Sequence, residues 1–144
     1  MVVIPKTKEH KDLAAKILYE RALVQPTNDL KTLLWYSKRG TIDWVVGYNA
    51  WIGTTVQMHV ACVGEYKYTP KALLKAGFDY PFNRCGVRVI FGIVNSLNDN
   101  VLNYDIKLGF KEKMRWKGMH DDGGDLILLE MQKENCKWIK HETI

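Results

Sequence analysis

The sequence has 144 residues, 47% hydrophobic and 26% charged, which is the composition of a globular protein and the length of one domain. Its net charge of +5 suits an anionic ligand, either a phosphorylated cofactor or nucleic acid, although the basic residues are scattered. No apolar run is long enough for a membrane span or a signal peptide, and the three cysteines show no disulfide or metal-ligand pattern. We therefore expect one cytoplasmic domain over residues 1–144, without a metal.

The first forty residues have helical patterns. The segment 8–23 places apolar residues on one side and charged residues on the other, which predicts a helix that ends before Pro26. Thr27 or Asn28 can cap a second, shorter helix that continues through three leucines to Gly40. The sequence thus predicts two helices before the first strand.

The following segments change to strand patterns. The segments 41–52 and 54–63 are rich in β-branched and aromatic residues, which predicts two antiparallel strands. Pro70 favours the start of a third helix, which extends to residue 85 and which Pro81 should bend near its end.

The C-terminal half alternates strand and helix. The apolar run 87–94 predicts a strand covered on both faces, and 98–108 predicts an amphipathic helix. The segments 110–119 and 126–131 predict two closing strands around an acidic, glycine-rich turn. The complete order predicts an α+β fold with a central mixed sheet flanked by helices.

Two segments resemble N-acetyltransferases of the GNAT superfamily. The run VRVIFGIVNSLNDNVLNYDIKLGFKEKMRWKG is similar to the family's strand, asparagine-bearing loop, helix ending in K-L-G-F and charged strand, with Asn98 and Phe110 at the family's positions. The run PKALLKAGFDYPF is similar to the helix after the cofactor loop in the ribosomal-protein acetyltransferase branch, and 131–138 resembles phage-associated members. The resemblance covers roughly 41–138 and implies the GNAT fold.

The resemblance implies acetyl-coenzyme A as co-substrate and direct attack by an amine in a ternary complex. In this family the pyrophosphate lies at the amino end of a helix, and the pantetheine arm lies between two splayed strands. The positions that would contact the cofactor are Met58, Val60, Cys62, Lys67, Tyr68, Thr69, Asn95, Asn98 and Asn100. Asn98 could bind either the arm or the amides of its own helix.

One departure concerns the phosphate-binding loop. The family's Q/R-x-x-G-x-G/A pattern is absent, because Tyr66, Lys67 and Tyr68 occupy the positions of its glycines. The alternatives are weaker cofactor binding, binding assisted by Lys67, or no cofactor.

Three residues are candidates for proton transfer. Many family members have a tyrosine proton donor where this chain has Asp105, whose carboxyl can donate at neutral pH only if burial raises its pKa. The adjacent Tyr104 is either a donor or a core aromatic. His59 is either a base of near-neutral pKa or a structural residue. The residues expected on the acceptor side are Gln57, Tyr48, Asn49 and Trp51, the last three of which could equally be ordinary sheet residues.

The acceptor itself is left open between protein N-termini, lysines, polyamines and other small amines. Two other functions are compatible with the residues: a GNAT-like nucleic-acid modifier, which the basic charge permits, and a non-catalytic binding module that has lost its cofactor loop. A homodimer is compatible with each of these functions, and membrane association is not expected.

Overall fold

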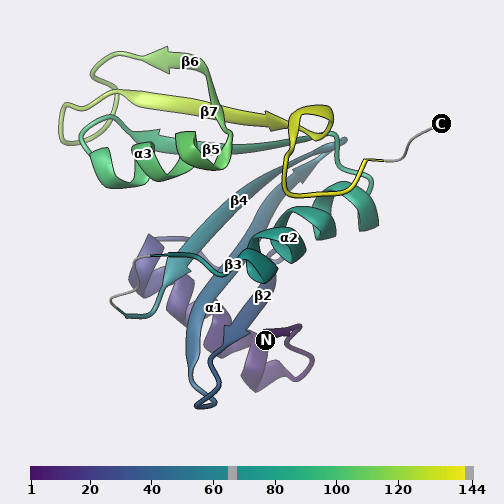
Figure 1. The fold of residues 1–144 in the computed structure, drawn as a ribbon. Helices are drawn as coiled ribbons and strands as arrows, with labels where there is room; N and C mark the ends of the chain where they lie inside the picture. The colour runs from purple at the N-terminus through teal and green to yellow at the C-terminus, as the bar shows by residue number, and fades with distance from the viewer. Residues whose placement is uncertain (65–67, 142–144) are drawn as a thin grey trace.

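The computed structural model describes residues 1–64 and 68–141, which form a mixed seven-stranded sheet in the order β1-β2-β3-β4-β5-β7-β6 (Figure 1). Neighbouring strands are antiparallel except β4 and β5, which are parallel. The strands are β1 (Val2–Val3), β2 (Lys31–Tyr36), β3 (Ile42–Ile52), β4 (Thr55–Cys62), β5 (Val89–Asn95), β6 (Lys111–Trp116) and β7 (Leu126–Gln132). The predicted α+β class with a mixed sheet is confirmed.

Helices cover both faces of the sheet. Helix α1 (Lys8–Ala22) packs on β2, β3 and β4, where Leu18 belongs to a small core. Helices α2 (Lys71–Asp79) and α3 (Asp99–Leu108) cover the opposite face, in front of the sheet in Figure 1, and the larger core around Phe78 lies beneath them. We call these two sides the α1 face and the α2/α3 face. No helix of the described residues is both long and apolar enough to span a bilayer.

The prediction of a second helix over 27–40 is wrong, because this segment contains strand β2. The neighbours Leu33 and Leu34 are both buried but on opposite faces, Leu33 in the larger core and Leu34 in the smaller one. A strand covered on both faces buries consecutive residues, so its leucines can imitate helical spacing. The other predicted helices and strands are present, with ends that differ by a few residues, and β1 is an additional strand.

Pro81 is accommodated by a π-helical turn, Tyr80–Arg84 (η1), which follows α2 directly. Proline has no amide hydrogen, so it cannot donate to the carbonyl of Gly77 four residues earlier. The hydroxyl of Tyr48 donates to this carbonyl instead, at 2.6 Å, and the amide of Cys85 donates to the Tyr80 carbonyl at 3.1 Å. The predicted distortion at Pro81 is therefore a wider helical turn. The Gly77 carbonyl, to which Pro81 cannot donate, accepts a hydrogen bond from Tyr48 of β3 instead.

The contact between α1 and the sheet depends on a glycine in β3. A Cβ at Gly47 would lie 2.6 Å from Cδ1 of the fully buried Leu18 and 3.4 Å from Cδ1 of Leu30. We expect Gly47→Ala to lower the free energy of unfolding by about 1–3 kcal/mol through overpacking, as measured by urea denaturation. An unchanged midpoint would contradict this close packing of α1 on β3.

Candidate active site

Strands β4 and β5 are paired at one end and separated at the other. Their register joins Thr55 with Val89, Val56 with Ile90 and Gln57 with Phe91, and it stops there. β4 nevertheless continues to Cys62 and β5 to Asn95. The two strands therefore border a gap in the sheet that begins after Gln57 and widens toward their carboxyl ends.

Backbone groups of both strands point into this gap. The Thr54 carbonyl accepts hydrogen bonds from the amides of Arg88 and Val89, which fixes which edge of β4 faces β5. Peptide groups alternate between the two edges of a strand, so every second residue of β4 and of β5 faces the gap. These residues are Met58, Val60 and Cys62 on β4 and Ile93 and Asn95 on β5. Four of them were predicted to lie along the cofactor.

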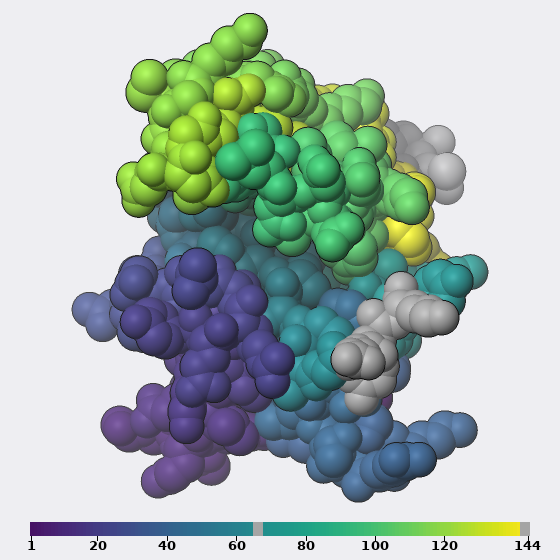
Figure 2. All heavy atoms as spheres, turned by 90° about the vertical axis from the view of Figure 1, so that its left-hand side faces the viewer, coloured from purple at the N-terminus to yellow at the C-terminus, as the bar shows by residue number. Residues whose placement is uncertain are grey.

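The gap opens at the surface, and a glycine leaves space beside it. Figure 2 shows the molecule hollowed between the purple and blue residues of its N-terminal part and the green residues above them, with darker teal residues at the floor. Gly92 lies on the α2/α3 face of β5, between the buried Ile90 and Val94. Apart from Gly92 and its two chain neighbours, only the Met58 carbonyl oxygen among the described residues would lie within 4 Å of a Cβ at Gly92, at 4.0 Å. A side chain is therefore missing from the core at the point where the strands separate.

His59 lies in β4 on the α1 face, paired with Gly47 of β3. Its Nε2 donates a hydrogen bond to Oδ1 of Asn49, 2.8 Å away. Burial lowers the pKa of His59 to about 4, because the charged imidazolium is poorly solvated there. The imidazole is therefore neutral at pH 7, and the near-neutral pKa expected from the residue type is corrected by its burial.

Asp105 lies on the side of α3 that faces the sheet, three residues from Leu102 and from the buried Leu108. Its side chain accepts no hydrogen bond from the described residues. Burial raises the pKa of Asp105 to about 7. This is the condition under which a carboxyl can hold a proton near neutral pH and donate it.

Tyr104 and Thr69 connect the two sides of the gap. The Tyr104 hydroxyl lies 2.6 Å from Thr69 Oγ1, which joins α3 above β5 to the segment that leads into α2. Burial raises the pKa of Tyr104, while its bond to Thr69 lowers it and the charges of Asp105 and Cys62 add to the rise. Besides its two alternatives, proton donor and core aromatic, Tyr104 has a third role as a contact between α3 and the segment before α2.

Two of the three asparagines predicted to contact the cofactor make hydrogen bonds within the protein, and the third is exposed. Asn95 Nδ2 donates to Asp122 Oδ2 at 2.6 Å and Asn95 Oδ1 accepts from the Leu97 amide, so this side chain holds two loops together. Asn98 is the N-cap of α3, with Oδ1 accepting from the Val101 amide at 3.4 Å. This corresponds to the second of its two alternatives. Asn100 is exposed on α3.

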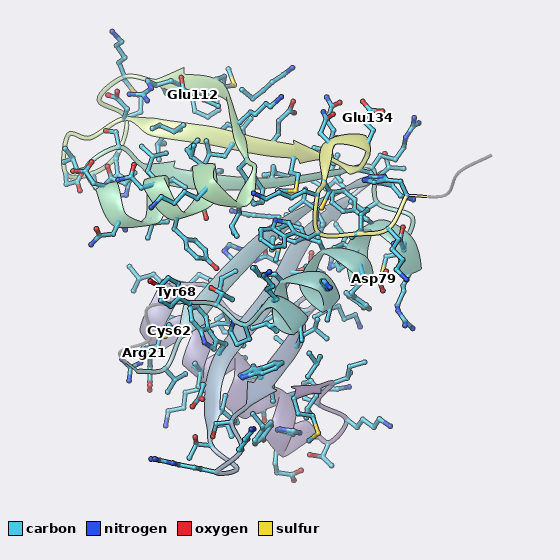
Figure 3. All side chains as sticks on the ribbon, in the orientation of Figure 1. Arg21, Cys62, Tyr68, Asp79, Glu112 and Glu134 are labelled. Atoms are coloured by element: carbon cyan, nitrogen blue, oxygen red, sulfur yellow. The ribbon has the colours of Figure 1, made fainter. Side chains whose placement is uncertain are left out.

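The remaining cofactor positions lie where β4 ends. Cys62 is half-buried, and its thiol donates to the Gly64 carbonyl at 3.3 Å. Tyr68 is 85% exposed, and Figure 3 places it beside Cys62 on the side of the molecule where the strands have separated. Lys67 lies outside the described residues. Pro70, the N-cap of α2, provides no side-chain cap for the amides of its first turn.

Two residues expected on the acceptor side belong to the core instead. Tyr48 is fully buried, and its hydroxyl is bound to the Gly77 carbonyl beneath α2. Trp51 packs against Tyr48 and Tyr80 on the same side, and its Nε1 donates to the Asp29 carbonyl. Alternation along β3 puts Tyr48 on the face opposite His59, and the shift in register after Asn49 brings Trp51 to that same face. Gln57, in contrast, shares the α1 face with His59.

A second hollow in the surface does not coincide with the gap. A hollow of about 540 Å³ lies at the paired end of β4 and β5, lined by Thr54, Arg88, Val89, Gln132, Lys133, Glu134 and His141. It contains none of the predicted site residues. Among residues 1–64 and 68–141, no three histidine, cysteine or acidic side chains are grouped as metal ligands.

Comparison with known proteins identifies the fold but not a close relative. No protein-family model matches the chain, and no curated protein matches it. The spermidine N-acetyltransferase of Vibrio cholerae, solved with CoA and spermine, is 10% identical with a TM-score of 0.72, over 94% of this chain and 96% of that one. A structure assigned as a phosphinothricin N-acetyltransferase is 16% identical with a TM-score of 0.69, over 92% and 97%. The chain therefore has the GNAT fold that its motifs predicted.

Proposed function

We propose that this chain is an acetyl-coenzyme A-dependent N-acyltransferase of the GNAT superfamily whose acceptor is an amine. The observation that carries the proposal is the gap between β4 and β5, bordered by backbone groups that pair with no strand of the described residues. The N-acetyltransferases that share the fold support the same assignment, and one of them was solved with CoA. The ribosomal-protein branch, the phage association, the cytoplasmic location and a homodimer stay predictions.

The residues at the gap fit the co-substrate. An extended pantetheine arm can pair with strand edges as a further strand does, and Met58, Val60 and Ile93 offer donors and acceptors for it. Gly92 leaves space for the arm on the α2/α3 face. The first turn of α2, for which Pro70 provides no side-chain cap, offers amides and a helix dipole to phosphate without the family's glycines.

Bound there, acetyl-coenzyme A would supply a thioester carbonyl that an amine can attack. His59 and Asp105 then have opposite tasks on opposite faces. On the α1 face, the neutral imidazole of His59 can accept a proton from the attacking amine, directly or through water. On the α2/α3 face, the protonated carboxyl of Asp105 can give its proton to the departing thiolate.

Titration with acetyl-coenzyme A tests the proposal directly. At 100 times its dissociation constant, a ligand that binds only the native state should stabilise the protein by about 2.7 kcal/mol, which a thermal-shift measurement detects. Acetylation of amines in a mixed panel, detected by mass spectrometry, then tests turnover. Stabilisation without turnover would identify a binding module. Failure of acetyl-coenzyme A to shift the transition would refute the enzyme assignment.

A further inference from the structure

The hydrogen bond between Asn49 and His59 fixes the state of the imidazole. The amide oxygen Oδ1 of Asn49 can only accept, so the His59 Nε2 that faces it at 2.8 Å must carry the hydrogen. In a neutral imidazole the other nitrogen, Nδ1, then holds the lone pair. Asn49 thus decides which ring nitrogen can take up a proton.

The backbone around Asn49 is built to hold its side chain in place. Asn49 pairs with Gln57 as the last regular pair before a bulge in β3. In the bulge, Ala50 has a φ of +52°, a conformation that non-glycine residues rarely adopt. Beyond it, the Trp51 amide and indole both donate to Asp29, which anchors this end of the strand. Bulges of this kind re-aim side chains beside functional sites.

We propose that Asn49 is a positioning residue of the acceptor side, which holds His59 in the Nε2–H tautomer and leaves Nδ1 as its only proton acceptor. The inference rests on the proposed function, because it gives His59 the role of base. It concerns the orientation of the proton acceptor and is independent of which amine the protein acetylates.

Among residues 1–64 and 68–141, no charged group alters the protonation of His59. The side-chain atoms nearest to a Cβ at the neighbouring Gly47 belong to the apolar Leu18 of α1 and Leu30 of the following loop. Gln57 lies on the same face of β4 and is uncharged. Asp29, the carboxylate on that loop, accepts from Thr27 and Trp51, and burial is the only cause of the shift at His59.

Nitrogen-15 NMR of the imidazole provides a test that does not need activity. In the unmodified protein at neutral pH, the spectra should show His59 as the Nε2–H tautomer. Asn49→Ala should give a mixture of tautomers, because it removes the acceptor. Asn49→Asp keeps the shape but places a carboxylate opposite the ring, so it should raise the His59 pKa by about one or more. The matched control, Asn103→Asp on the exposed side of α3, should leave the His59 signals unchanged.

The pH profile of acetylation gives the second readout. Asn49→Asp should move the acidic limb of kcat/KM to higher pH together with the NMR titration of His59. The inference is overturned if Asn49→Ala leaves the tautomer unchanged, or if Asn49→Asp shifts neither the titration nor the acidic limb. Because binding of acetyl-coenzyme A is measured separately by thermal shift, failure of this inference is distinguishable from failure of the proposed function.

Discussion

Replacing Asp105 with asparagine should stabilise the protein by about 2–4 kcal/mol at pH 8 and have almost no effect on stability at pH 4 and below. The unfolded chain releases the Asp105 proton near pH 3.8, but the native state holds it until about pH 7. Between these values the native state binds more protons, so the unmodified protein loses stability as the pH rises. Asparagine removes this loss, because it carries no charge at any pH.

His59 changes the free energy of unfolding in the opposite direction over the same pH range. Its pKa falls from 6.5 in the unfolded chain to about 4 in the native state, so below pH 6.5 the unfolded state binds more protons. Stability therefore falls as the pH drops from 6.5 to 4. In the unmodified protein the slopes of His59 and Asp105 largely offset each other. In Asp105→Asn the slope of His59 should become visible, which urea denaturation at several pH values can measure.

The same substitution should separate stability from activity. We expect Asp105→Asn to lower kcat by about 10²- to 10⁴-fold and to abolish the alkaline limb of kcat/KM near pH 7, since the variant has no proton to donate. Asp121→Asn, at an exposed position in the β6–β7 loop, makes the same chemical change as a control and should alter neither property. Parallel stability curves for Asp105→Asn and the unmodified protein would show that Asp105 is not buried as a neutral acid.

Most of the fold can be predicted from local sequence patterns. The main error of that prediction, a helix in place of strand β2, also has a local cause. Glycines and prolines mark the ends of segments, and the apolar run of β5 correctly indicates a strand. The expectation that this strand is covered on both faces is wrong, because Ile90 and Val94 are buried on the α2/α3 face while Ile93, on the other face, is 47% exposed. The leucines of β2 satisfy both a helical period and a two-sided strand, and only its pairing with β3 decides between them. The partner that makes Pro81 tolerable, the Tyr48 hydroxyl, comes from 33 residues away in the sequence and leaves no local signal.

The candidate site is less predictable because it depends on burial and register. Motif position indicates Asp105, but its raised pKa requires the environment under α3. His59 is recognisable as a strand histidine, whereas its bond to Asn49 depends on the register of a hairpin that contains a bulge. Tyr48 and Asn49 are neighbours in sequence, and alternation sends one into the core and the other to the α1 face. From the sequence alone, Gly92 is a glycine that weakens a strand, and only the structure shows the space beside it.

That space makes Gly92→Val the most direct test of the gap. Valine favours strands over glycine, and a Cβ at this position makes only an ordinary contact, at 4.0 Å from the Met58 carbonyl oxygen. We expect the free energy of unfolding to stay unchanged or rise by about 0.5–1 kcal/mol. Binding of acetyl-coenzyme A should nevertheless weaken by about 10- to 100-fold, because the two γ-methyl groups occupy the space assigned to the arm.

A graded series makes this result independent of folding. Gly92→Ala should weaken binding less than Gly92→Val, so that affinity falls with side-chain volume while stability does not. Ile93→Val keeps the backbone groups of Ile93 that border the gap and changes only its side chain, which projects from the opposite face of β5. This variant should leave the dissociation constant nearly unaltered. Calorimetric titration of all three variants measures the affinities. Unchanged affinity in Gly92→Val would show that the arm does not pass beside β5, and the assignment of the gap as the cofactor site would then be wrong.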